Sequence, residues 1–244
     1  MIDLPPLLDL EDALWTALMD ISSLHPEGWT LVGGQMVLLH ALEAGALPPR
    51  ASRDLDLVVD ARLRPPQVPR MAEVFDELGF ALTDVSPGGE AHRFTRGPVS
   101  IDLLATEGAG ARANLGVGSG ASTISVEGGT FALSRTELVE VSSGGRSGCV
   151  PRPDVAGALL IKARAAKLDR RRGPERHLRD LAFLLSLVAA PLEVRDALGK
   201  KNRHHLAALV SLHDPDHEAW GLLDPQPRAD AISAHGIITG HRLP

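Results

Sequence analysis

Two aspartates interrupt an otherwise apolar segment in the first third of the chain, and this feature limits the possible folds most strongly. The segment RDLDLVVD, residues 53–60, reads as a β-strand rich in Leu and Val. Side chains alternate between the faces of a strand, so Asp54 and Asp56 share one face while Leu55 and Leu57 point into the core. Two carboxylates on one face repel each other unless a cation lies between them, which makes this a candidate cation site.

The sequence around the pair separates a functional interpretation from a structural one. Alone, an Asp-x-Asp pair also fits an exposed strand face or the cap of a neighbouring turn. A second segment with the same pattern, VSIDLLA at residues 99–105, places Asp102 between apolar residues and predicts a third carboxylate in the same cluster. Hard oxygen ligands suit Mg²⁺, which keeps several waters and shares the phosphates of a substrate.

A double glycine lies upstream of the aspartates. Gly33 and Gly34 stand between the strand TLV and the helical pattern QMVLLHALEAG. Glycine lets a phosphate approach the backbone, and a helix N-terminus favours an anion, although a tight strand-to-helix turn would also require glycine. Arg50 and Ser52 come just before the aspartates, where they are candidates for phosphate contacts.

The charge is distributed unevenly. The net charge is −6, yet residues 162–179 hold eight Lys or Arg against two acids. This run is either a solvated helix face or a site for an anion or a nucleic acid. Within it, Arg170, Arg171 and Arg172 fall where the helical pattern breaks, so we expect them at an exposed helix end, where they would contact backbone phosphates if the partner is an RNA.

The pattern of the whole chain predicts an α/β (α+β) fold with a mixed sheet, followed by a helical C-terminal part. We place the boundary after SSGGRSG, giving domains at 1–150 and 151–244. We further expect a hairpin across Gly128 and Gly129, and loose structure over the last 25 or so residues. The N-terminus lacks a basic region and no apolar run is long enough to cross a membrane, so we expect a cytoplasmic protein without membrane contact.

The combination of motifs resembles the polymerase-β-like nucleotidyltransferase superfamily. More narrowly, LVGGQMVLLH followed by PRASRDLDLVV is similar to the AbiEii-type toxin family, which includes the MenT-like toxins. That family has a double glycine opening a helix, then Arg-x-Ser/Thr-x-Asp-hydrophobic-Asp, and later a functional Lys and an Asp. Here ALLIKARAAKLDRR would supply Lys162 and HLRDLAFLL would supply Asp180, which could alternatively form a helix salt bridge to Arg176. Many superfamily members carry Ser after the first glycine, whereas this chain has Gly34 followed by Gln35.

The resemblance implies a reaction and its components. A nucleoside triphosphate (NTP) would bind with two Mg²⁺ ions on Asp54 and Asp56. Asp102 would complete the metal site or act as the general base. Lys162 would contact the nucleotide and is also a candidate catalytic residue. The remaining nucleotide contacts would come from Gly33, Gly34, Arg50, Ser52 and Asp180.

The resemblance also implies partners. In the toxin branch the acceptor is RNA, notably the tRNA 3′ end, and a cognate antitoxin accompanies the toxin. Two alternatives stay open at this point. One is a small-molecule nucleotidyltransferase of the antibiotic-modifying kind, and the other is a non-catalytic nucleotide- or partner-binding module on the same fold. The sequence assigns no role to residues 191–244.

Overall fold

The chain forms two compact units in a computed structural model that describes residues 1–4, 9–48, 50, 52–110, 113–169 and 173–241. Unit 1 comprises Met1–Met36 and Ser52–Pro153, and unit 2 comprises Val37–Ala51 and Asp154–Pro244. The helical unit therefore includes a segment from the N-terminal part of the chain. The division into two domains at residue 150 stays a prediction.

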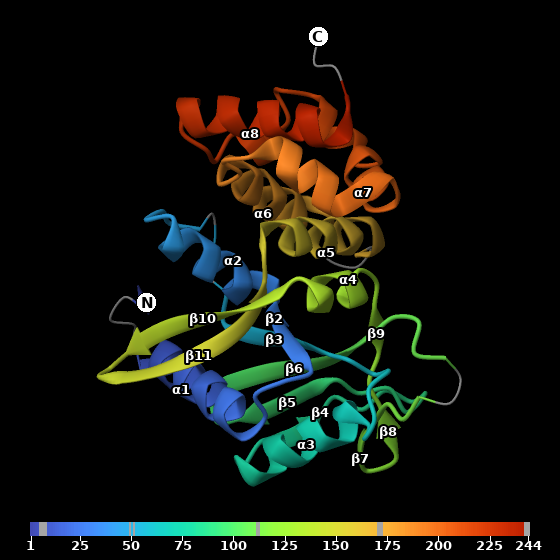
Figure 1. Ribbon diagram of the computed structural model, residues 1–244. Helices are drawn as coiled ribbons and strands as arrows, with labels where there is room; N and C mark the ends of the chain where they lie inside the picture. Colours follow the sequence, from blue (N-terminus) through green and yellow to red (C-terminus); the bar gives the residue numbers. More distant parts are fainter. Residues whose placement is uncertain (5–8, 49, 51, 111–112, 170–172, 242–244) are drawn as a thin grey trace. The chain divides into compact units, whose positions relative to one another are not determined.

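Unit 1 is built on a mixed sheet with the strand order β2–β3–β6–β5–β4, and β9 also pairs with β6. The central strands β3 and β6 run parallel, while β2, β5 and β4 are joined by antiparallel pairing (Figure 1). The strands are β2 (Trp29–Val32), β3 (Asp54–Val59), β4 (Ala81–Thr83), β5 (Arg93–Arg96), β6 (Val99–Thr106) and β9 (Ser125–Val126). The mixed sheet expected from the sequence is thus confirmed, with both aspartate segments at its centre.

A smaller sheet in unit 1 contains β1 (Ile2–Asp3), β10 (Thr136–Ser143) and β11 (Arg146–Pro153). Strands β10 and β11 form a hairpin that turns at Gly144 and Gly145, whose φ angles are +55° and +80°. Positive φ at both turn residues is what a type I′ two-residue hairpin turn requires. The glycine-rich segment that we read as a domain boundary is therefore this hairpin turn.

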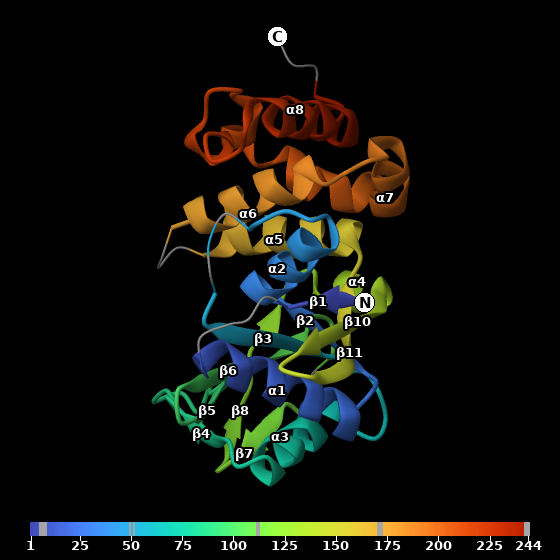
Figure 2. The same ribbon diagram turned by 90° about the vertical axis from the view of Figure 1, so that its left-hand side faces the viewer.

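Helices cover both faces of the larger sheet in unit 1, as Figures 1 and 2 show. On one side lie α1 (Asp9–Leu24) and α3 (Gln67–Glu77), and on the other lies the short α4 (Gly129–Ser134). Leu55 and Leu57 are fully buried. Val58 points toward α4, because its Cγ1 would lie 3.0 Å from a Cβ atom on Gly129. Alternation along the strand therefore puts Asp54 and Asp56 on the α4 side of the sheet.

One local prediction in unit 1 needs correction, and a second glycine-rich segment has a structure that its composition did not predict. The hairpin expected across Gly128 and Gly129 is wrong, because Gly128, with φ +87°, precedes the first turn of α4 instead of linking two strands. The Gly- and Ala-rich segment 107–121 contains β7 (Gly116–Gly118), which pairs with β8 (Ala121–Ser122). In both places local glycine content did not reveal which longer contacts the backbone makes.

Unit 2 is helical. Its helices are α5 (Val155–Leu168), α6 (Glu175–Ser186), α7 (Pro191–Ala207) and α8 (Pro225–Thr239), with short 3₁₀ turns η1 (Val210–His213) and η2 (Glu218–Trp220). The end of α2 (Gly33–Glu43) also belongs to this unit. Leu178, Leu181 and Leu185 are buried on α6, as their spacing predicted.

The C-terminal segment departs from the sequence expectation. We expected loose structure there, yet α8 is a regular helix whose Ala231, Ala234 and Ile238 are buried. The small residues of α8 pack on α6 and α7. These tertiary contacts stabilise a helix that the amino-acid composition of the segment did not predict. Arg170, Arg171 and Arg172 lie outside the described residues. Within the described part of the chain, no helix is long and apolar enough to span a membrane.

Candidate active site

The aspartates of unit 1 lie next to one another across two strands. Asp56 of β3 is the register partner of Asp102 of β6, and Asp54 is the partner of Ser100. Partners in neighbouring strands are about 4.8 Å apart at the backbone. The side chains of Asp56 and Asp102 therefore project from the same face of the sheet, together with Asp54. Asp54 and Asp56 are half-buried, and Asp102 is buried.

The turn before α2 is shaped around Asp56. Gly33 has φ +70°, and a Cβ atom added to it would overlap Oδ2 of Asp56 and lie 2.6 Å from its Cγ. No other residue fits there without moving the carboxylate, because real Cβ atoms keep a greater distance from their neighbours. The double glycine is thus a strand-to-helix turn that also gives Asp56 its position. The sequence interpretation explained Gly33 by a tight turn or by phosphate binding, and did not include this close approach to Asp56.

A short chain of hydrogen bonds orients Asp54. The hydroxyl of Ser52 donates to Oδ1 of Asp54 at 2.8 Å. The buried amide of Gln35 in turn donates from Nε2 to the Ser52 carbonyl oxygen at 2.8 Å. Gln35, the residue after the double glycine, therefore anchors the backbone of Ser52. The sequence interpretation placed Ser52 on a phosphate and assigned no contact to Gln35.

Asp102 is paired with an arginine that the sequence interpretation missed. Arg93 of β5 donates from Nε and Nη2 to the two oxygens of Asp102, both at 2.8 Å. This hydrogen bonding raises the pKa of Arg93; burial opposes the shift, and the charges of Asp102 and Asp54 add to it. Arg93 is thus a permanent cation that compensates the buried carboxylates of the sheet.

The pairing by Arg93 bears on metal binding. Among the described residues, His, Cys, Asp and Glu side chains form no group of three arranged to hold a metal ion. Both oxygens of Asp102 accept hydrogen bonds from Arg93, so they point to the guanidinium. Asp54 and Asp56 fit Mg²⁺ better, because this ion is often bound by one or two carboxylates with substrate phosphates and water completing its shell.

Three predicted nucleotide-binding residues, Arg50, Lys162 and Asp180, form one ion cluster in unit 2. Asp180 of α6 accepts from Nε of Arg50 at 3.1 Å and from Nη2 at 2.9 Å. It also accepts from Nζ of Lys162, on α5, at 2.6 Å. The side chains of Lys162 and Asp180 are 3% and 1% exposed. Arg176 instead pairs with Asp169 at 2.6 Å, whereas the helix salt bridge considered from the sequence would have joined it to Asp180.

The ionisation states in this cluster follow from burial and charge. Burial alone would raise the pKa of Asp180, but Lys162 and Arg50 outweigh it and the pKa is lowered. Burial lowers the pKa of His177 to about 4, and the charges of Lys162 and Arg176 add to the effect. Asp180 is therefore charged and His177 neutral near pH 7. The cluster holds two cations around one carboxylate and leaves a positive balance suited to an anion.

The mixed sheet, the glycine turn and the aspartates on one sheet face define the nucleotidyltransferase class of proteins. A solved structure of an antigenic nucleotidyltransferase-like protein from Paracoccidioides brasiliensis has a similar fold, with a TM-score of 0.52, 14% identity, and coverage of 94% of this chain and 93% of that chain. None of the curated proteins matches the sequence. Residues 17–234 match the family described as nucleotidyl transferase AbiEii toxin, type IV toxin–antitoxin system. The chain belongs to this family of nucleotidyltransferase toxins.

Membership in the family confirms part of what the sequence predicted. The chain is a nucleotidyltransferase. A type IV toxin–antitoxin family implies an NTP substrate and an antitoxin partner. The metal, the acceptor and the role of each site residue stay predictions.

Proposed function

We propose that the protein uses Mg²⁺ to transfer a nucleoside monophosphate from an NTP to the 3′ end of a tRNA or a related RNA. The observation that carries this proposal is the register pairing of Asp56 with Asp102, with Asp54 on the same sheet face. An acceptor hydroxyl would attack the α-phosphorus, the bond to the β-phosphate oxygen would break, and pyrophosphate would leave. The proton of the hydroxyl would pass to a carboxylate.

Each candidate site residue of unit 1 has a role in this proposal. Asp54 and Asp56 would hold Mg²⁺, which when bound supplies charge neutralisation at the phosphates. Ser52 orients Asp54 through its 2.8 Å hydrogen bond, and Gly33 leaves room for the Asp56 carboxylate. Asp102 would join the metal ligands or accept the proton when Arg93 turns toward substrate phosphates, because those phosphates compete with Asp102 for the guanidinium. Gly34 would let a phosphate approach the backbone at the start of α2.

The ion cluster of unit 2 is proposed to serve the nucleotide. Lys162 and Arg50 are cations, and Asp180 holds both by direct hydrogen bonds. Because Lys162 is buried against Asp180, a phosphate would bind its ammonium group only by competing with the Asp180 carboxylate. We therefore assign Asp180 the role of keeping both cations charged and ordered, and assign phosphate binding to Arg50 and Lys162.

The proposal is tested by incubating the protein with each of the four α-³²P NTPs, Mg²⁺ and total RNA. Label entering one RNA species from one NTP is the expected result, with none after EDTA treatment. The variant Asp56→Asn should lose transfer while it keeps its fold, because it removes a ligand charge and adds no bulk. Label appearing only in small molecules would point to an antibiotic-type enzyme. Binding of NTP without any turnover would point to a non-catalytic module and overturn the proposal.

The expected physiological setting follows the family. A toxin that blocks tRNA ends would stop growth, and a cognate antitoxin would restore it. Co-expression with a cognate antitoxin should therefore relieve growth arrest caused by the wild-type chain, while Asp56→Asn should cause no arrest. The cytoplasmic location expected from the sequence stays a prediction.

A further inference from the structure

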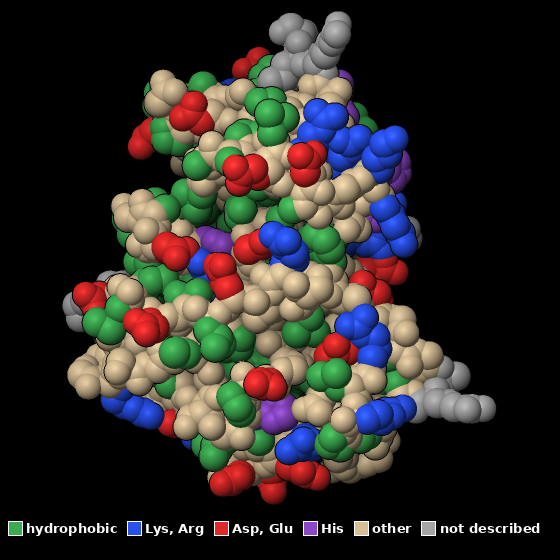
Figure 3. Space-filling model, in the orientation of Figure 1, with side chains coloured by type: hydrophobic (Ala, Val, Ile, Leu, Met, Phe, Trp, Pro, Cys, Tyr) green, Lys and Arg blue, Asp and Glu red, His purple; other side chains and the backbone are tan. Residues whose placement is uncertain are grey.

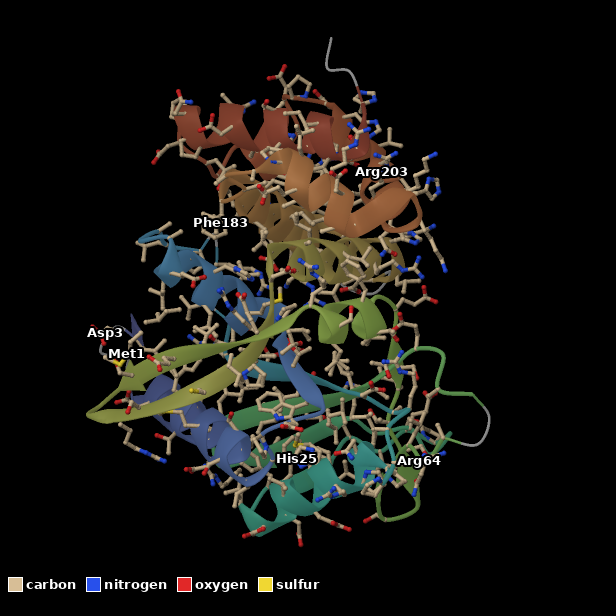
Figure 4. All side chains as sticks on the ribbon, viewed as in Figure 1. Met1, Asp3, His25, Arg64, Phe183 and Arg203 are labelled. Atoms are coloured by element: carbon tan, nitrogen blue, oxygen red, sulfur yellow. The ribbon has the colours of Figure 1, made fainter. Side chains whose placement is uncertain are left out.

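Unit 2 carries a group of basic side chains that the proposed reaction does not use. The group, called the α5–α7 patch below, consists of two residues of α5, Arg164 and Lys167, and four of α7, Lys201, Arg203, His204 and His205. Figure 3 shows blue side chains gathered along the edge of unit 2 where α7 lies, and Figure 4 shows Arg203 directed outward from α7. Lys167, Lys201 and His204 are exposed, and the other three are half-exposed.

The two helices bring these residues together by direct contact. Nη1 of Arg164 lies 2.9 Å from Nδ1 of His205, which joins the middle of α5 to the end of α7. Gly199, with φ +62° and ψ 173°, breaks α7 between its two halves. Glu193 and Asp196 precede this break, whereas residues 200–207 contain no acid. The sequence of α5 also contains no acid, so the patch joins two segments whose charged residues are all basic.

The electrostatic environment of His205 also indicates that the α5–α7 patch is strongly positive. Partial burial lowers the pKa of His205, and the positive charges of Arg164 and Lys167 add to the shift, followed by those of His204 and Lys201. Every charge that shifts this imidazole is positive. In a protein of net charge −6, such a basic patch is a local exception and attracts a polyanion.

We propose that the α5–α7 patch binds the phosphate backbone of the RNA acceptor. This inference rests on the proposed function, because it names the surface that receives the same acceptor. An RNA backbone fits better than a single phosphate, because the cations are spread over two helices and do not converge on one buried point. The RNA contact expected from the sequence at Arg170, Arg171 and Arg172 stays a separate prediction.

The test is RNA binding measured without NTP or Mg²⁺, so that catalysis plays no part. Fluorescent tRNA is titrated with wild type and with Lys167→Gln/Lys201→Gln at several salt concentrations. Removing one cation that binds a phosphate should reduce the slope of log Kd against log salt by about one. We expect a slope lower by about two and weaker binding for the double variant. Lys167→Arg/Lys201→Arg should bind like wild type.

A matched control removes two exposed charges from unit 1. Arg64→Gln/Arg70→Gln has the same net charge as the double variant, and both arginines are exposed, with Arg64 labelled in Figure 4. It should leave the salt slope unchanged. Equally weakened binding in both double variants would show a general charge effect and overturn the patch. Polyglutamate, a model for an acidic protein, is titrated in the same way. If Lys167→Gln/Lys201→Gln loses polyglutamate binding but keeps normal tRNA binding, the patch binds an acidic protein and the inference is overturned.

The inference and the proposed function can fail separately. Patch-dependent RNA binding by a chain that transfers no nucleotide would leave the inference standing and remove the function. Normal RNA binding by Lys167→Gln/Lys201→Gln, in a background that transfers nucleotide to RNA, would remove the inference alone.

Discussion

Gly33 and Asp56 are packed so closely that a Cβ atom on the glycine would overlap the carboxylate of the aspartate. Gly33 opens α2 and Asp56 lies in β3, so this packing joins the glycine turn to the aspartate strand. The two motifs, separated in the sequence by the rest of α2 and a loop, form one structural feature. Changing either residue should therefore affect the other.

Gly33→Ala should reduce both stability and transfer. A left-handed backbone costs a non-glycine residue about 1–2 kcal/mol, and the added methyl group must also displace Asp56. Gly97→Ala is the control, because Gly97 has φ +56° but no atom within 4 Å of its added Cβ. Urea denaturation and transfer assays on both variants separate the two costs. Normal activity in Gly33→Ala would show that the position of Asp56 is unimportant.

Arg93→Ala should leave Asp102 as a buried carboxylate without its guanidinium. We expect a destabilisation of about 1–3 kcal/mol in the metal-free protein, the cost of a buried charged group deprived of its partner. Mg²⁺ should then raise the melting temperature of the variant more than that of wild type, because the freed carboxylate can bind the ion. Differential scanning fluorimetry with and without Mg²⁺ measures this. An identical metal response in both proteins would argue against Asp102 as a ligand.

Lys162→Met should destabilise unit 2 by about 3 kcal/mol, as expected when one partner of a buried ion pair is removed. Arg50 still contacts Asp180, so part of the stabilisation should remain. Adding Asp180→Asn should recover part of the stability, which a double-mutant cycle would measure. The exposed pair Arg179–Glu218 is the comparison, and Arg179→Met should cost less than about 1 kcal/mol. Similar costs at both pairs would contradict the importance of burial.

Acid should weaken the protein through two buried histidines. Burial lowers the pKa of His177 and of His235 to about 4, below the ordinary value of 6.5. Because the pKa is lower in the folded protein, the unfolding free energy has its full value above pH 6.5. It decreases as the pH falls toward about 4, since the unfolded chain then binds protons that the folded protein does not. Each histidine contributes up to about 1.4 kcal/mol per pH unit in that window.

Replacing these histidines should flatten the pH dependence. His177→Gln and His235→Gln each remove one proton-binding group from the unfolded chain, so their unfolding free energies should change less between pH 7 and about pH 5. Denaturant titrations across this range measure the slope. His204→Gln, at an exposed histidine of the same unit, controls for the substitution itself. An unchanged slope in both buried variants would mean that other groups cause the acid sensitivity.

The pairing of Arg93 with Asp102 follows from the register of one tight hairpin. With a two-residue turn at Gly97 and Pro98, Arg96 must face Val99, and counting back puts Arg93 opposite Asp102. The register of a tight hairpin is local, so the sequence contains this pairing. The pairing of Asp56 with Asp102 is different. It depends on a parallel crossover through α3, β4 and β5, whose geometry no local pattern specifies.

The sequence by itself determined the central strands, the helices with regular apolar spacing and the aspartate pair on one strand face, because these follow from periodicity within a few residues. The tertiary structure decided which groups meet. It placed Arg93 on Asp102, Arg50 and Lys162 on Asp180, and α8 in the position where a loose tail was expected. These contacts join residues distant in sequence, and packing of whole elements selects them, so no short segment contains the information.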